Sequence, residues 1–292
     1  MCIRDRLVPE AGPLLVDVTH EACGDLENYQ GQILRGIDHW LLRLSSLENI
    51  SMYGHHGLAV GDVNNDGLDD LYVCDGGGLP NRLYLQNEDG SLRDASAEAG
   101  VDWLEDSQSA LLVDLDNDGD QDLVVTTWPL TLIAENDGMG RFNLRGGHPA
   151  VGKAFSPTAV DYDNDGDLDV ALANNHAEGK HPLYRNDLDP ELATRSLVAA
   201  VTDQAGNWAR AGTKVTISRE SDGFLSARLV DTGGGYSSQS VGPVHFGLPP
   251  GSGVITLTTS WFEAGELQTM TVPEISLEEL NSKWLFVRTE VR

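Results

Sequence analysis

The chain has few basic residues, few cysteines and no long apolar run. Its 292 residues include 19 Lys and Arg against 46 Asp and Glu, which gives a formal net charge of −27 at pH 7. Phosphate contacts need clustered cations, so this composition argues against direct binding of nucleic acid. It also argues against docking on anionic lipid, and no segment is apolar enough to predict direct membrane insertion.

The three cysteines are too few and too scattered for a zinc site, which needs closely spaced ligands. They are Cys2, Cys23 and Cys74. If the chain is exported, a Cys23–Cys74 disulfide can form. The alternative is a buried free thiol at Cys74, inside a predicted strand. The sequence leaves both alternatives open.

Three copies of one short acidic loop dominate the sequence. They occupy residues 62–70, 114–122 and 161–169, and each places oxygen side chains at positions 1, 3, 5 and 9 with glycine at position 6. This spacing suits Ca²⁺, which takes six to eight oxygen ligands. The backbone carbonyl of position 7 would add a ligand. The predicted metal ligands, for about three Ca²⁺ ions, are Asp62, Asn64, Asp66, Leu68, Asp70, Asp114, Asp116, Asp118, Asp120, Asp122, Asp161, Asp163, Asp165, Asp167 and Asp169.

These loops are not the helix–loop–helix calcium motif, which needs a bidentate Glu at position 12. Position 12 is Val73, Val125 and Leu172 in the three copies. Short apolar, partly β-branched segments flank each loop, which predicts a turn between two strands. Solvated hairpins that bind nothing are the alternative. Four to five carboxylates in each copy would repel one another without a cation.

The repeat is longer than the loop. The loops begin 52 and then 47 residues apart, and a second hairpin with an Asn follows each strand pair, at Asn87, Asn136 and Asn186. A period near 50 with four strands per unit is typical of a propeller blade. The predicted fold class is therefore all-β, with a β-propeller over residues 55–190.

These repeats resemble the FG-GAP/VCBS family of calcium-binding propeller repeats, found in integrin α-subunit heads and many bacterial surface proteins. The resemblance implies that the acidic positions listed above bind calcium, with the first site weakened because Asn64 replaces an acid. Three blades are fewer than a closed propeller needs, so residues before 55 supply a degenerate blade or further blades are missing. Residues 1–6 resemble a non-native leader, and we expect the natural protein to begin upstream.

Residues 7–54 form a separate N-terminal segment. Residues 15–19 resemble the strand that ends a family repeat. Apolar residues then recur at helical spacing from Ile33 to Leu47, which predicts an amphipathic helix over about residues 31–48.

The C-terminal part changes character after a linker at residues 187–191. Alternating segments and frequent turns predict a small antiparallel β domain over residues 195–292. It resembles the ASPIC/UnbV domain, which often follows FG-GAP/VCBS repeats. The matching pieces are residues 210–215, 234–240 and 245–248, with Trp261 and Gly265. The two domains together resemble the bacterial relatives of cartilage acidic protein.

The sequence favours a non-catalytic interaction or adhesion module with a protein or glycan partner. Loops that fill at millimolar Ca²⁺ indicate the periplasm, the cell envelope or the extracellular space, although no signal peptide is visible. No nucleophile motif, phosphate loop or His-Glu-x-x-His motif occurs. One alternative is a polysaccharide-acting enzyme, with His55, His56, His176 and His181 in the propeller channel for acid–base work. Another is a scaffold part of a larger secreted protein.

Overall fold

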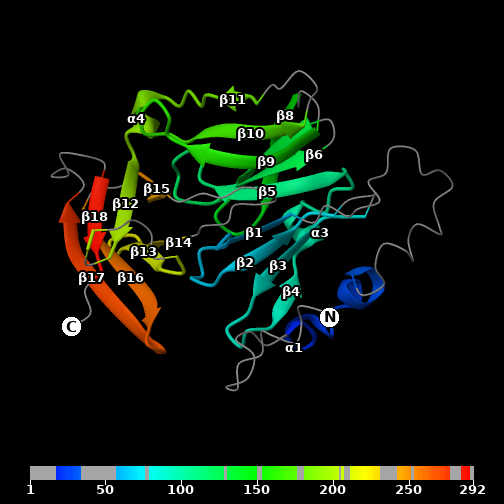
Figure 1. The fold of residues 1–292 in the computed structure, drawn as a ribbon, viewed down its shortest axis with the longest axis horizontal. Helices are drawn as coiled ribbons and strands as arrows, with labels where there is room; N and C mark the ends of the chain where they lie inside the picture. Colours follow the sequence, from blue (N-terminus) through cyan, green and yellow to red (C-terminus); the bar gives the residue numbers. More distant parts are fainter. Residues whose placement is uncertain are drawn as a thin grey trace, which may run out of the picture.

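The structure is a computed structural model of the whole chain and is dominated by strands (Figure 1). It describes residues 18–33, 57–75, 79–127, 130–149, 153–175, 181–203, 205–206, 211–230, 242–250, 253–276 and 284–289. Their strands form five sheets, three from the acidic repeats and two from the C-terminal part. The predicted all-β class, with propeller blades followed by a β domain, is confirmed.

Each acidic repeat forms one antiparallel sheet whose strands follow one another in chain order, as in a propeller blade. The first blade consists of β1 (Leu58–Gly61), β2 (Asp70–Val73), β3 (Arg82–Gln86) and β4 (Leu92–Asp94). The second consists of β5 (Ser107–Val113), β6 (Asp122–Thr127), β7 (Leu130–Asn136) and β8 (Phe142–Pro149). The third contains β9 (Lys153–Val160), β10 (Asp169–Asn175) and β11 (Leu183–Tyr184). The acidic loops join β1 to β2, β5 to β6 and β9 to β10.

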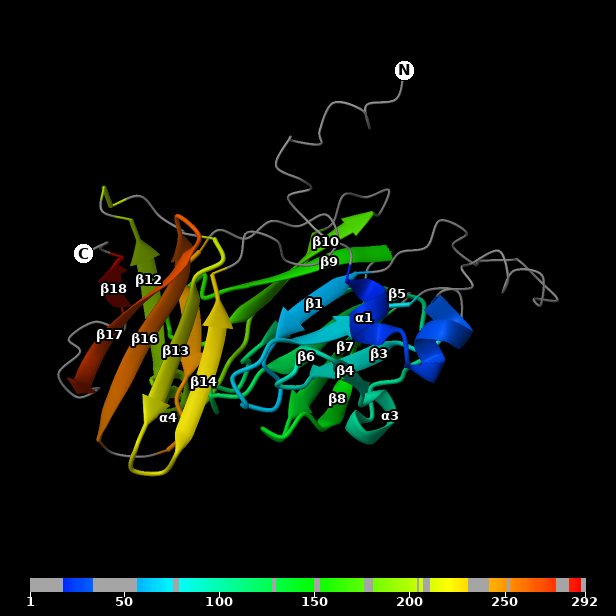
Figure 2. The same ribbon diagram turned by 90° about the horizontal axis from the view of Figure 1, so that it is seen from below.

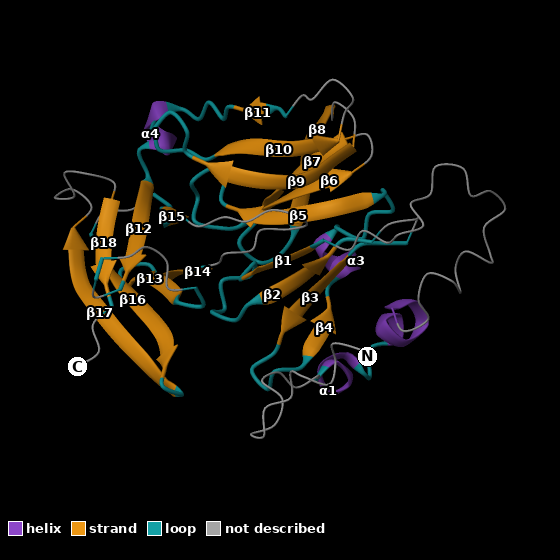
Figure 3. Ribbon diagram, in the orientation of Figure 1, coloured by secondary structure: helices purple, strands orange, loops and turns teal. Residues whose placement is uncertain are grey.

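The blades pack side by side through their apolar faces, with β5 between β1 and β9 (Figure 3). All six residues of β6 are buried, because the middle blade is covered on both faces. In β2, which is covered on one face, burial alternates along the strand. One cluster, including Tyr72 and Leu123, joins the first two blades, and another, including Val124 and Leu172, joins the second and third. Neighbouring blades therefore complete one another's core.

The C-terminal sheets pack face to face around a second apolar core (Figure 2). One sheet places β12 (Ser196–Thr202) between β15 (Val244–Gly247) and β18 (Trp284–Arg288). The other has the order β14 (Phe224–Leu229), β13 (Lys214–Arg219), β16 (Val254–Glu263) and β17 (Glu266–Ser276). The pairs are antiparallel except β12 with β18, which run parallel.

Short helices complete the described chain. They are α1 (Thr19–Cys23), the π-helical turn η2 (Tyr29–Ile33), α3 (Ser96–Ala99) and α4 (Pro190–Ala193). The linker predicted at residues 187–191 runs into α4, where Asp189 caps the helix by accepting a hydrogen bond from Glu191 N at 3.0 Å. None of the helices that the structure describes has the length and apolar character needed to cross a bilayer.

Some predictions for the N-terminal part fall outside the described residues. The amphipathic helix over 31–48 overlaps them only at residues 31–33, which belong to η2, and residues 1–17 are also outside. Thr19 begins a helix, so the strand expected to end there is wrong at that residue. Cys23 and Cys74 form no disulfide in the part of the chain that the structure describes, and Cys74 is buried directly after β2. The structure thus has the buried thiol and not the disulfide.

Candidate metal centres

Each acidic loop makes its sharp turn through two left-handed residues. The Asn at position 4 has φ of 58° in Asn65, 58° in Asn117 and 62° in Asn164. The Gly at position 6 has φ of 85° to 103°. Side chains other than Asn and Asp rarely adopt this conformation, and glycine adopts it at no steric cost. The Asn-x-Gly spacing therefore folds all three loops in the same way.

The Asp at position 1 closes the loop around its own backbone. Asp62 accepts hydrogen bonds from Asp66 N at 3.1 Å and Gly67 N at 2.8 Å. Asp161 accepts the equivalent bonds from Asp165 N and Gly166 N, both at 3.1 Å. These bonds gather the loop's oxygens on the inner side of the turn.

The Asp at position 9 ties the loop to the second hairpin of its blade. In the second blade, Asp122 accepts a hydrogen bond from Leu115 N at 2.8 Å with one oxygen and from Asn136 N at 2.9 Å with the other. Asp70 and Asp169 make the same pair of bonds in the other blades. This carboxylate therefore has a structural role in addition to its predicted role as a ligand.

The second and third loops bring three carboxylates together at metal-binding distance. Asp114, Asp116 and Asp122 each offer an oxygen, and these oxygens lie within 4.8 Å of one another. Asp161, Asp163 and Asp169 form the same group in the third loop. These two acidic clusters can hold metal ions, and their oxygen-only donor sets favour a hard cation.

The first loop differs from the other two. Asp62, Asp66 and Asp70 form no such group among the described residues. Asn64, at position 3, donates a hydrogen bond to Asp66 Oδ2 at 2.9 Å and so occupies an oxygen that was predicted to bind the ion.

The carboxylates at position 5 hydrogen-bond within their own loops. Asp66, Asp118 and Asp165 accept hydrogen bonds from the backbone N–H two residues further on, at 2.8 Å, 3.0 Å and 3.2 Å. They lie outside the two close groups that the structure forms. The calcium roles of position 5 and of the carbonyls of Leu68, Asp120 and Asp167 stay predictions.

Among the three acidic loops, the second has the carboxylates whose pKa values are raised furthest. Burial, reinforced by neighbouring carboxylates, raises the pKa of Asp114 to about 7 and that of Asp122 to about 8. Burial also raises the pKa of Asp116 and Asp70 to about 6. The Oδ1 atom of Asp114 is buried and accepts no hydrogen bond from the described residues. A cation would satisfy this oxygen and neutralise the crowded carboxylates, so the residues present fit a metal ion.

Asparagines that the ligand pattern did not single out join each loop to its neighbour. Asn136 Nδ2 donates to Val63 O at 2.8 Å, and Asn186 Nδ2 donates to Leu115 O at 2.7 Å. Each acceptor is position 2 of the preceding blade's loop. Asn117 Nδ2 donates in the other direction, to Gly166 O at 3.1 Å. The recurrence of Asn at these places in the repeat was the sequence signal for this role.

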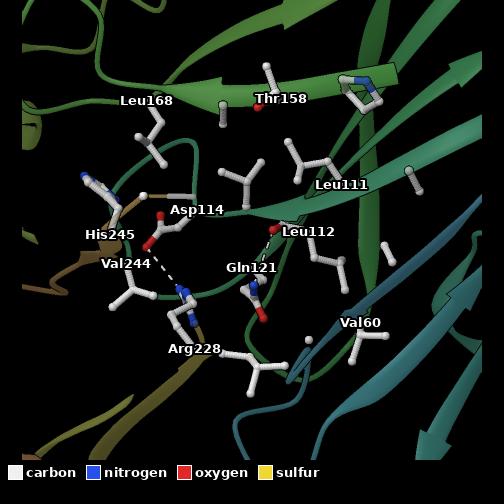
Figure 4. Close-up of a pocket in the computed structure, with 18 of the residues that line it drawn as sticks. Val60, Leu111, Leu112, Asp114, Gln121, Thr158, Leu168, Arg228, Val244 and His245 are labelled. Atoms are coloured by element: carbon white, nitrogen blue, oxygen red, sulfur yellow. Dashed lines mark hydrogen bonds and ion pairs between the residues drawn. The ribbon is translucent and has the colours of Figure 1, made fainter. Parts of the chain in front are cut away.

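The predicted histidine set lies mostly outside the described residues. This applies to His55, His56 and His176, whereas His181 is exposed and accepts a hydrogen bond from Asn174 N at 3.1 Å. A cavity of about 470 Å³ lies between the first strands of the blades and the C-terminal domain (Figure 4). Most of its lining residues are apolar, and the polar ones are Asp69, Asp114, Gln121, Thr158, Arg228 and His245.

The fold and the loops define a repeat protein with β-propeller blades, whose acidic clusters could hold metal ions, and a C-terminal β domain. Residues 62–125 and 114–172 match the family of FG-GAP-like repeats, and residues 203–277 match the ASPIC and UnbV family. The chain therefore carries FG-GAP-like repeats followed by an ASPIC/UnbV domain, as the sequence predicted.

Comparisons with individual proteins add little. No curated protein matches the chain. Among solved structures, the chain is similar to an Agrocybe aegerita lectin described as recognising non-reducing terminal N-acetylglucosamine. That similarity has 13% identity and a TM-score of 0.28, over 78% of this chain and 69% of the lectin. At this TM-score it supports no conclusion about fold or ligand.

Proposed function

We propose that this protein is a calcium-dependent, non-catalytic interaction module of the extracellular space or cell envelope, with a protein or glycan as its partner. FG-GAP repeats are typical of extracellular and envelope proteins, and their combination with an ASPIC/UnbV domain indicates an interaction module. The observation that carries the calcium assignment is the second loop, where Asp114 Oδ1 is buried without a hydrogen bond beside Asp116 and Asp122.

In this proposal, calcium acts by making the blades rigid. The ion supplies positive charge among buried carboxylates, and the chain's own residues hold the loop in place around it. At a calcium concentration about 100-fold above Kd, each filled site adds roughly 2.7 kcal/mol of stability. We expect the second and third loops to fill first and the first loop last, because Asn64 supplies no charge and engages Asp66.

Rigid blades would present fixed surface loops to the partner. The net charge of −27 favours a partner that tolerates or complements an acidic surface, and disfavours nucleic acid and anionic membranes. The sequence contains no nucleophile motif, phosphate loop or His-Glu-x-x-His motif, which favours binding over catalysis.

A calcium titration of stability tests the proposal. The melting temperature of the full chain should rise saturably with Ca²⁺ and much less with Mg²⁺, which prefers octahedral sites with several waters. Asp116→Asn should reduce the rise. Asp89→Asn is the matched control, because Asp89 is exposed in a turn of the first blade outside the acidic loops. A cooperative melt that Ca²⁺ does not shift would refute the calcium assignment.

A further inference from the structure

The C-terminal domain contacts all three acidic loops at the same position. Lys214 Nζ donates to Gly67 O at 2.7 Å, and Ser226 Oγ donates to Gly119 O at 2.9 Å. His245 Nε2 lies 3.3 Å from Gly166 O. In each loop the contacted atom is the carbonyl oxygen of the position 6 glycine. Three side chains from three different strands, β13, β14 and β15, thus reach equivalent atoms of loops that start 52 and 47 residues apart.

The contact between the C-terminal domain and the acidic loops is most buried at the second loop. Arg228 is buried there, donates to Gly119 O at 3.2 Å and lies 3.7 Å from Asp114 Oδ2 (Figure 4). The C-terminal domain holds this guanidinium in place through Ser226 Oγ at 2.8 Å and the Phe246 ring at 5.3 Å. The loop and the domain therefore share one buried polar network.

Gly247 completes this contact through its backbone. Its N–H donates to Asp114 Oδ2 at 2.9 Å. A Cβ at this position would collide with the Asn117 backbone and with the Asp114 carboxylate, so only glycine allows this approach. These contacts engage Asp114 Oδ2 and leave Oδ1, which has no hydrogen bond, for the ion.

We infer that the ASPIC/UnbV domain is a clamp on the metal loops, and that cation binding in the loops and docking of this domain stabilise one another. The inference rests on the proposed function, because it describes how the same metal sites are regulated. The clamped glycine carbonyl fixes the peptide that leads into position 7, where the predicted backbone ligand lies. A loop already held in this conformation loses less entropy when it binds the ion.

Reciprocity gives the inference a second measurable consequence. If docking of the domain favours the ion, the ion must favour docking by the same factor.

Lys214 and Arg228 would oppose an incoming cation by charge, but the second loop carries five Asp residues around one Arg, so its field still attracts a cation. Ser226 is uncharged, and its removal therefore tests the positioning effect while both cations stay in the chain.

Hydrogen exchange on the full chain, with and without Ca²⁺, tests the clamp. Calcium should slow exchange about fivefold or more in segments 224–229 and 244–247, although these contain no metal ligand. Ser226→Ala should weaken calcium affinity, measured by calorimetry, by about fivefold and reduce this protection. Ser260→Ala is the matched control, because Ser260 lies in the same sheet and its side-chain hydrogen bond is with Thr269 of β17 and not with an acidic loop. It should leave affinity and protection unchanged.

The outcomes separate the two proposals. If calorimetry shows calcium binding but exchange in segments 224–229 and 244–247 stays the same, and Ser226→Ala binds calcium as Ser260→Ala does, the clamp is wrong while the calcium assignment stands. If no calcium binds, both are wrong. A slowed exchange together with weaker binding in Ser226→Ala alone supports the clamp.

Discussion

The buried carboxylates of the second loop predict that pH acts in opposite directions on the metal-free and the calcium-bound protein. Asp114 and Asp122 are each 1% exposed, and burial raises their pKa to about 7 and about 8. The folded metal-free protein therefore binds more protons than the unfolded chain between about pH 4 and pH 8. Its stability should fall as the pH rises through this range.

The magnitude follows from linkage. A folded pKa of about 7 against an unfolded value near 3.9 makes Asp114 contribute roughly 2 kcal/mol of lost stability between pH 5 and pH 7, and Asp122, with a folded pKa of about 8, contributes a slightly larger amount. The sum is a large share of the 5–15 kcal/mol of a typical domain. It corresponds to a melting temperature lower by on the order of 10 °C. Calcium requires the ionised carboxylates, so in saturating Ca²⁺ stability should rise over the same range.

Thermal unfolding at pH 5.0 and pH 7.5 measures both slopes. Buffers should be depleted of calcium on a chelating resin, because EGTA binds Ca²⁺ poorly at pH 5. Asp114→Asn keeps an acceptor oxygen for Gly119 N and Gly247 N but cannot ionise, so it should remove about half of the metal-free slope. A metal-free protein that becomes more stable from pH 5.0 to pH 7.5, or a slope unchanged in Asp114→Asn, would refute the reasoning.

Three further predictions concern single side chains. Asp122→Ala leaves two backbone N–H groups without their carboxylate acceptor and should cost about 3 kcal/mol or more by urea unfolding, whereas the exposed Asp89→Ala should cost about 0.5 kcal/mol or less. Asn136→Ala removes the bond that joins the second blade to Val63 O and should cost about 1–3 kcal/mol, with faster hydrogen exchange in both blades. Asn64→Asp replaces a hydrogen bond to Asp66 by a repulsion between two carboxylates that only a cation relieves. The variant should therefore have a lower melting temperature without metal and a higher calcium affinity in calorimetry. Equal affinity in the variant and the original chain would contradict this.

The local features of the acidic repeats were determined by sequence alone. Oxygen side chains at positions 1, 3, 5 and 9, with Gly at position 6 and short apolar segments on both sides, predicted a turn between two strands, and the structure has this turn three times. The period near 50 predicted the blades, since each repeat contains its own hairpins. Such features depend on residues close in the chain, where conformational preference and spacing suffice.

The contacts between repeats and between domains were decided by tertiary structure. Spacing did not reveal that Asp122 holds the backbone of two hairpins, that Asn136 reaches the preceding loop, or that position 5 turns to its own backbone. Nor did it reveal that Ser226 would meet Gly119, because the two lie 107 residues apart and no local pattern links them. Only the packing of the C-terminal sheets against the blades brings these two atoms to hydrogen-bond distance and buries Asp114. Because a buried carboxylate is costly unless an opposite charge neutralises it, this burial is what favours a cation beside Asp114.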